Sequence, residues 1–223
     1  MNRLEDLFVD GNGKIAFLTA GDPTLDCTKE YILALEAKGV DLLELGIPFS
    51  DPIAESGVIQ EANIRALKNK VNTDDIFLMI KELRDSTNIN ICLKTYLNVI
   101  FHYGYDKFFK KCKEVQVQGV VIPDLPYEES LEVKAISDKY GIEIITTVTY
   151  TSFNRIEKLV KDARGFIIVD NKVDNRIIDE IRKYSKLAII SNNKDLKVDG
   201  FVNDEVLVTS LNKQGIKAID SLY

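Results

Sequence analysis

The stretch LLELGIPFSDPIAESGVIQ, residues 42–60, places a carboxylate inside an apolar strand and then continues into a loop rich in proline and charge. Side chains alternate along a strand, so Leu43 and Leu45 share one face and Glu44 lies on the other. Runs that are apolar on both faces are typical of parallel sheets, which are covered on both sides. Because an unpaired buried carboxylate is costly, Glu44 is predicted to be either functional or paired with a nearby lysine.

The alternation of short apolar runs and longer amphipathic segments extends in both directions from this stretch. The runs predict eight strands, at residues 14–20, 42–47, 89–96, 119–125, 142–149, 165–170, 187–192 and 200–208. Apolar residues at helical spacing predict helices at 24–38, 73–84, 106–114, 128–140, 152–162 and 174–183. Repeated β-then-α units predict a (β/α)8 barrel forming a single domain over residues 1–223. An open doubly wound sheet is the less favoured alternative, because no GxGxxG follows the first strand.

The C-terminal third of the chain departs from this regularity. Only SNNKDLKVD, residues 191–199, precedes the last predicted strand, and this segment is too short for a full helix. A barrel normally needs about 250 residues, whereas this chain has 223. We therefore expect the seventh helix of the barrel to be vestigial or absent.

Composition narrows the classes of function. The chain has 29 basic and 35 acidic residues, a net charge of −6, which disfavours nucleic acid as a partner. Hydrophobic residues make up 45%, enough for a sizeable core and too many for intrinsic disorder. No apolar run approaches the ~20 residues of a membrane span, and the first residues are acidic where a signal peptide would be basic and then apolar. We therefore expect a cytoplasmic protein with neither a nucleic-acid nor a membrane partner.

Cysteine and histidine content argues against a metal site. Cys27, Cys92 and Cys112 share no CxxC spacing, and we predict that they are small core hydrophobes. The single histidine, His102, rules out any site that needs two imidazoles. A surface or core role is favoured for it, because nothing in the sequence supplies an orienting partner.

In a barrel, catalytic residues lie at the carboxyl ends of the strands. Three predicted strand ends carry polar residues: 19–23 (TAGDP), which also reads as an ordinary turn, the loop after Glu44, and 122–126 (IPDLP). Asp124 in the third could accept a hydrogen bond from a neighbouring strand end. Glu55 in the second could face Glu44, and two carboxylates in different environments can act as general acid and general base.

Five motifs carry a resemblance to a known family. They are FLTAGDPT (17–24), residues 42–60 as quoted, LKTYLNVIFHYGYDKF (93–108), GVVIPDLPYEES (119–130) and the weaker RGFIIVD (164–170). Over about residues 14–170 the chain resembles the tryptophan synthase alpha subunits. The resemblance implies a (β/α)8 barrel and a lyase of tryptophan biosynthesis, which cleaves indole-3-glycerol phosphate to indole and glyceraldehyde 3-phosphate. It also implies an α2β2 assembly with a β subunit that receives the indole and carries pyridoxal phosphate, so no cofactor is expected in this chain.

The resemblance also implies roles for individual residues. Glu44 would move the protons of indole C3 and of the glycerol hydroxyl, and Glu55 would handle the indole N–H. The implied substrate-binding residues are Phe17, Tyr96, Asp124 and Ile168, although aromatic residues in strands are also ordinary core. The implied partner-interface residues are Pro48, Phe49, Asp51 and Pro52.

Three departures from the family pattern bear on catalysis. Glu55-Ser56-Gly57 stands where the family has Asp-Gly-Pro, and a misplacement of 1 Å can cost on the order of 10²-fold in rate. Ile168 stands where the family has an active-site tyrosine. Residues 171–175 (NKVDN) replace the family's glycine-containing closing loop.

The expected phosphate site departs furthest from the family. The family binds phosphate with glycine-rich backbone after strands seven and eight, whereas this chain has Ser191-Asn192-Asn193 and Asp204-Glu205. Missing amide donors and two carboxylates oppose an anion, so we expect this site to be lost. Two alternatives to the lyase follow: a catalytically impaired subunit that docks to and regulates a β subunit, and a barrel lyase or isomerase for a non-phosphorylated substrate.

Overall fold

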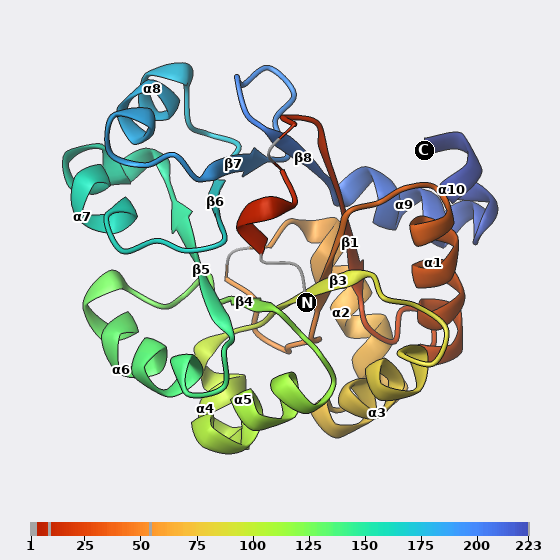
Figure 1. The fold of residues 1–223 in the computed structure, drawn as a ribbon. Coiled ribbons are helices and arrows are strands. Elements are labelled where there is room, and N and C mark those ends of the chain that lie inside the picture. The colour runs from red at the N-terminus through yellow and green to blue at the C-terminus, as the bar shows by residue number, and fades with distance from the viewer. Residues whose placement is uncertain (1–3, 9, 54, 223) are drawn as a thin grey trace.

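The fold is a closed barrel of parallel strands in the order β1 to β8, seen in a computed structural model that describes residues 4–8, 10–53 and 55–222. The strands are β1 (Gly13–Thr19), β2 (Leu42–Gly46), β3 (Asn90–Lys94), β4 (Gly119–Val121), β5 (Glu143–Val148), β6 (Phe166–Val169), β7 (Ala188–Ser191) and β8 (Gly200–Asn203). Pairing of β8 with β1 closes the ring, and Figure 1 shows the helices arranged around it. The predicted (β/α)8 barrel is confirmed, and the open sheet is wrong.

The helices follow the strands around the outside of the ring. They are α1 (Leu25–Ala37), α2 (Gly57–Lys68), α3 (Thr73–Leu83), α4 (Leu97–Tyr103), α5 (Tyr105–Glu114), α6 (Tyr127–Asp138), α7 (Ile156–Val160), α8 (Asn175–Tyr184), α9 (Glu205–Gln214) and α10 (Lys217–Leu222). Five of the six predicted helices match α1, α3, α5, α6 and α8 within two residues at each end. The sixth, 152–162, divides into a 3-10 segment, η2 (Tyr150–Arg155), and α7. No helix lies between β7 and β8, all of whose residues are described, which confirms the expected loss of the seventh helix.

Helices α2, α4, α9 and α10 were not predicted, and two predicted strands are too long. Helix α2 buries Ile59, Ala62 and Ala66 at helical spacing, but the proline- and charge-rich sequence before it is typical of a continuing loop. The strand predicted at 200–208 ends at Asn203, because α9 begins at Glu205. The strand predicted at 119–125 ends at Val121, because Pro123 has no N–H to donate to the sheet.

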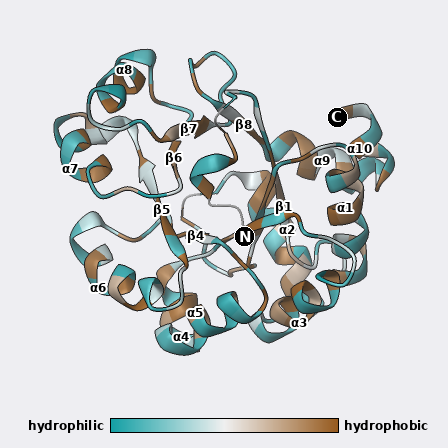
Figure 2. Ribbon diagram, in the orientation of Figure 1, coloured by the Kyte–Doolittle hydropathy of each residue, from teal (hydrophilic) through white to brown (hydrophobic). Residues whose placement is uncertain are grey.

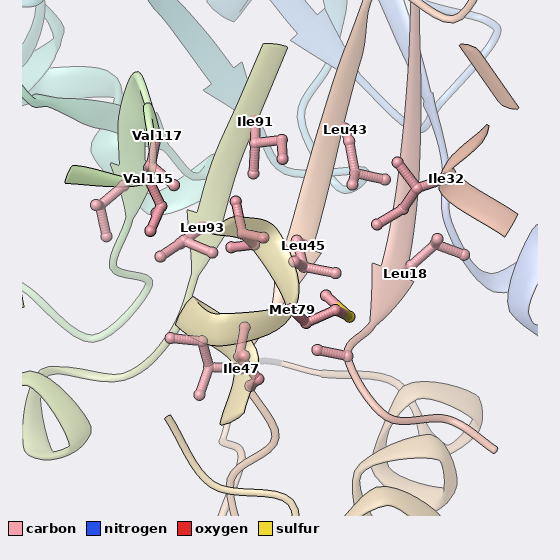
Figure 3. Close-up of a cluster of buried hydrophobic side chains, with 14 of the residues drawn as sticks. Leu18, Ile32, Leu43, Leu45, Ile47, Met79, Ile91, Leu93, Val115 and Val117 are labelled. Atoms are coloured by element: carbon pink, nitrogen blue, oxygen red, sulfur yellow. The ribbon is translucent and has the colours of Figure 1, made fainter. Parts of the chain in front are cut away.

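Strand alternation divides the core into an outer layer and a barrel interior. Outward-facing residues of the first three strands, among them Leu18, Leu43 and Leu93, pack with Ile32 of α1 and Met79 of α3 (Figure 3). The helices show alternating teal and brown bands in Figure 2, the pattern of helices buried on one side. The interior is filled by Ile15, Leu42, Cys92, Val121, Ile145, Phe166 and Ile190, together with Leu4 of the 3-10 segment η1 (Leu4–Asp6) and Phe8.

The cysteines are all free thiols. Cys92 and Cys112 are buried, as predicted, whereas Cys27 is only half-buried at the edge of the core. In the described part of the chain, no helix combines the length and apolar character needed to cross a bilayer.

Candidate active site

Glu44 lies where the sequence places it, near the carboxyl end of β2 with its side chain inside the barrel. Its strand neighbours in register are Phe17 of β1 and Cys92 of β3. The residue is 5% exposed. Leu43 and Leu45 pack in the outer layer, so the alternation along β2 directs Glu44 to the interior.

Glu55 reaches the same point from the loop between β2 and α2. Its carboxylate does not meet Glu44 directly in a hydrogen bond but through Lys94, the last residue of β3. Lys94 Nζ lies 3.1 Å from Glu55 Oε1 and 3.4 Å from Glu44 Oε1. The side chains of Glu44 and Glu55 are 7% and 6% exposed, and that of Lys94 is 21% exposed. The structure therefore brings the two predicted carboxylates together around one ammonium group.

Lys94 is a site residue that no sequence motif singled out. A nearby lysine was the expected alternative to a functional Glu44, and the ion pair is present. The signal was available, because Lys94 follows Cys92 by two positions in a strand, which places both side chains on the inward face. The position of Lys94 along β3 relative to Glu44 on β2 could not be predicted, because it depends on the register between the two strands.

Burial and charge act in opposite directions on these groups. Burial raises the pKa of Glu44, Lys94 lowers it, and Glu55 and Asp204 raise it, with a net upward shift. Burial alone would lower the pKa of Lys94, but attraction and hydrogen bonds from Glu44 and Glu55 outweigh it and raise that pKa. The lysine is therefore a protonated cation at neutral pH, and Glu44 is the carboxyl group best suited to carry a proton.

Aromatic side chains line the site beside the carboxylates. Lys94 Nζ lies 5.2 Å from the centroid of the Phe17 ring. A Cβ at Gly46 would lie 2.9 Å from Phe17 Cζ, so glycine at this position makes room for the ring. Tyr96, just before α4, stacks on Phe49 with centroids 5.1 Å apart. Phe17 thus lies in the site with Glu44 and Glu55, whereas Tyr96 packs against Phe49 of the loop after β2.

The other two predicted substrate-binding residues make different contacts. Asp124 Oδ1 accepts a hydrogen bond of 2.9 Å from the backbone N–H of Leu97, the first residue of α4. The donor is not a strand end, as predicted, but the start of the helix that follows β3, and the bond ties the carboxylate to that helix start. Ile168 is half-buried in β6 and packs against the apolar interior. Their roles with substrate stay predictions.

The predicted partner-interface residues form the loop that follows β2. Pro48 is buried, Phe49 and Pro52 are half-buried, and Asp51 is exposed and accepts a hydrogen bond from Ser50 Oγ. Ile53, next in the loop, is 81% exposed. The loop therefore presents an apolar and an acidic side chain to solvent while its base is held in the barrel.

The expected phosphate region is occupied by the chain's own side chains. The Asp204 carboxylate accepts a hydrogen bond from the backbone N–H of Glu205, at the start of α9. The other oxygen of Asp204 accepts from Asn192 Nδ2. A carboxylate thus sits where a helix start would otherwise attract an external anion.

His102 is exposed on α4, edge-on to Phe101, as expected of a surface histidine. In the described ranges, no group of three or more histidine, cysteine, aspartate or glutamate side chains is arranged to hold a metal ion.

The fold and the site together define the class of protein. An eight-stranded parallel barrel with two buried carboxylates at its strand ends has the architecture of (β/α)8-barrel enzymes, whose chemistry lies at that face. The sequence profile of the family described as "Tryptophan synthase alpha chain" matches residues 9–173. The chain belongs to the tryptophan synthase alpha chain family.

Relatives and solved structures agree with this assignment. A tryptophan synthase alpha chain of Lacticaseibacillus casei is 47% identical over 169 residues, which cover 76% of this chain and 64% of the relative. One from Synechococcus elongatus is 35% identical over 232 residues, covering 93% of this chain and 87% of the relative. The structure of tryptophan synthase subunit alpha from Campylobacter jejuni superposes with a TM-score of 0.85 at 29% identity, over 96% of this chain and 95% of the other.

The chain is short beside several of these relatives. The matched region covers 64% of the length of the Lacticaseibacillus casei protein and 59% of that from Alkaliphilus metalliredigens. The family profile ends at residue 173, ahead of β7 and β8. The part of the barrel outside the profile match is thus the part that holds Asn192 and Asp204.

Proposed function

We propose that this chain is a carbon–carbon lyase that cleaves indole-3-glycerol phosphate to indole and glyceraldehyde 3-phosphate. The observation that carries the proposal is the convergence of two buried carboxylates, Glu44 and Glu55, at the mouth of the barrel beside Phe17. Family membership supports the same reaction. The raised pKa of Glu44 suits a group that must both give and take a proton near neutral pH.

The reaction needs two carboxyl groups with different tasks. Glu44 in its protonated form donates a proton to indole C3, and Glu55 accepts a hydrogen bond from the indole N–H, which stabilises the positive charge that develops on the ring nitrogen. Glu44, now ionised, removes the proton of the adjacent glycerol hydroxyl. The O–H electron pair forms the aldehyde C=O, the bond from this carbon to indole C3 breaks, and its electrons restore the aromatic ring. Protons balance, and Glu44 ends protonated.

The proposed partner is a tryptophan synthase β subunit in an α2β2 assembly, which would receive the indole and hold the pyridoxal phosphate. Support comes from a tryptophan synthase complex of Pyrococcus furiosus, which superposes with a TM-score of 0.85 at 28% identity over 94% of each chain. The proposed contact surface is the loop of Pro48, Phe49, Asp51 and Pro52. Its exposed Ile53 offers apolar area at the same edge.

The experiment is an indole-release assay on the purified chain, alone and with an added tryptophan synthase β subunit. We expect release of indole from indole-3-glycerol phosphate, increased by the β subunit. No release in either condition, from protein that is folded by circular dichroism, would refute the lyase.

A second candidate is a catalytically impaired subunit that regulates a β subunit by docking. One observation favours it: Asp204 fills the helix start where phosphate would be held. Under this function the chain would change the activity of the β subunit without releasing indole. The same assay, with tryptophan formation from added indole as a second readout, separates the two candidates.

A further inference from the structure

Lys94 links the two carboxylates of the proposed active site. It ends β3, beside Gly46 of β2 and Val121 of β4 in register, and its side chain points into the barrel mouth. Its ammonium lies 3.1 Å from Glu55 Oε1, 3.4 Å from Glu55 Oε2 and 3.4 Å from Glu44 Oε1. Both oxygens of Glu55 are thus in contact with one donor.

The environment of Lys94 argues against two common roles of a lysine in a barrel, imine formation with a substrate and a solvated surface charge. A lysine that forms an imine with a carbonyl substrate must be neutral, whereas the two carboxylates raise the pKa of Lys94 and keep it protonated. A solvated surface lysine would be largely exposed, whereas this side chain is 21% exposed. The remaining role is that of a fixed positive charge between two acids.

Glu55 depends on such a contact because it comes from a loop. In the described part of the chain, the main-chain carbonyl of Glu55 also accepts a hydrogen bond from Gln60 Nε2 at 2.9 Å. That bond holds the backbone before α2 but does not involve the carboxylate. Contacts to the ammonium from both oxygens aim the carboxylate inward.

We propose that Lys94 is a positioning residue of this site: its ammonium holds the Glu55 carboxylate inward beside Glu44 and neutralises one of the two negative charges there. The proposal rests on the proposed function, since it gives the two carboxylates their separate tasks. It adds a third group to the acid–base pair. The pair works only while Lys94 gives the two carboxylates different charge environments and different orientations.

The electrostatic consequence is measurable at Glu44. The groups that face it are Lys94 of β3, Glu55 of the loop before α2, Asp204 before α9 and the thiol of Cys92 on the adjacent strand. Of the charged groups, Lys94 lowers the pKa of Glu44, while Glu55 and Asp204 raise it. Removing the ammonium therefore raises the pKa of Glu44 further.

The first test is a carboxyl-carbon NMR titration of protein labelled with ¹³C at the glutamate side chains, without substrate. The Glu44 signal is identified by its absence in Glu44→Gln. We expect Lys94→Met to raise the midpoint of the Glu44 titration by about one pH unit or more. The matched control is Lys14→Met, an exposed lysine of β1, which should leave the midpoint unchanged. An unchanged midpoint in Lys94→Met overturns the proposal.

A second pair of variants keeps the test decisive if Lys94→Met does not fold, since that change leaves two buried carboxylates without their counter-charge. The pair is Glu55→Gln and Glu55→Gln/Lys94→Met, in which only one carboxylate of the pair remains. We expect the Glu44 midpoint to be higher in the double variant than in Glu55→Gln. Equal midpoints would show that Lys94 does not act on Glu44 and would overturn the proposal.

The kinetic test separates this inference from the proposed function. In a protein that releases indole, Lys94→Met should lower kcat by about 10- to 100-fold and move the alkaline limb of the kcat–pH profile to higher pH, because protonated Glu44 starts the reaction, while Lys94→Arg should recover part of the rate. A protein that releases no indole refutes the lyase, yet the NMR titration still decides the role of Lys94. Release of indole at full rate by Lys94→Met, with an unshifted profile, overturns the inference and leaves the lyase intact.

Discussion

Asn192 Nδ2 donates a hydrogen bond of 2.8 Å to Asp204 Oδ2 and thereby joins the end of β7 to the start of α9. The other oxygen of Asp204 accepts a 2.6 Å hydrogen bond from the backbone N–H of Glu205. Helix starts attract anions because their first N–H groups lack partners within the helix. In this chain, the internal carboxylate already accepts from the N–H of Glu205 and adds negative charge beside the start of α9.

Replacing Asp204-Glu205 by Gly-Ser should therefore improve binding of a phosphorylated ligand. The change removes like charge, worth ~1 kcal/mol at ~4 Å even in bulk water, and it frees backbone amides at the start of α9. We expect affinity for glycerol 3-phosphate to rise by about tenfold, measured by calorimetric titration. Loss of the Asp204 cap should lower the stability by about 1 kcal/mol.

Asp174→Gly is the matched control for this variant. Asp174 caps α8 by accepting from the backbone N–H of Arg176, so its loss should cost similar stability without changing phosphate affinity. Tight binding of glycerol 3-phosphate by the unaltered chain would contradict the loss of the phosphate site. Binding by neither protein would favour the regulatory candidate.

Glu44→Gln should lower kcat for indole release by about 10²- to 10⁴-fold, because the amide keeps the shape of the side chain but cannot transfer the proton. The fold and the binding of a β subunit should be retained, as measured by circular dichroism and by co-elution. Glu132→Gln, on the exposed face of α6, is the control and should keep the full rate. Undiminished turnover of the Glu44 variant would remove this residue from the mechanism.

The raised pKa of Glu44 predicts a pH dependence of stability. An acid with a raised pKa in the fold contributes stability that is fully present below its unfolded pKa, near 4.5, and is lost as the pH rises through the folded pKa. Glutamine cannot lose a proton, so Glu44→Gln should gain free energy of unfolding relative to the unaltered chain as the pH is raised from 4 to 8. Urea denaturation at both pH values measures the difference. If the difference in free energy of unfolding between the two proteins is the same at pH 4 and pH 8, Glu44 titrates alike in the folded and unfolded states.

The outer layer of the barrel predicts a contrast between two leucines. Leu43 is fully buried between β2 and the helices (Figure 3), whereas Leu78 on α3 is 57% exposed. Leu43→Ala should lower the free energy of unfolding by about 2–5 kcal/mol because it leaves a cavity. Leu78→Ala should change it by about 0.5 kcal/mol or less. Thermal and chemical denaturation of both variants provide the measurement, and equal losses would contradict the packing described.

Several features could be predicted from the sequence because they depend on residues close together in the chain. Apolar runs predicted the eight strands, and helical spacing predicted five of the helices. The alternation of side chains along β2 predicted that Glu44 points into the barrel. The length of residues 191–199 alone excluded a full helix there. Helix α2 was missed because the start of its buried face, at Ile59, follows a loop whose prolines and charges dominate the local pattern.

The meeting of Lys94 with Glu44 and Glu55 was decided by the tertiary structure alone. Strand pairing sets Lys94 level with Gly46, two residues beyond Cys92 and Glu44, and the loop before α2 carries Glu55 back to the same point. Likewise, Asp204 begins a helix instead of continuing a strand because its carboxylate is bonded to Glu205 and to Asn192. Sequence fixes which face of a strand a side chain occupies. Register between strands and the course of loops determine which charges meet, and these depend on the packing of the whole barrel.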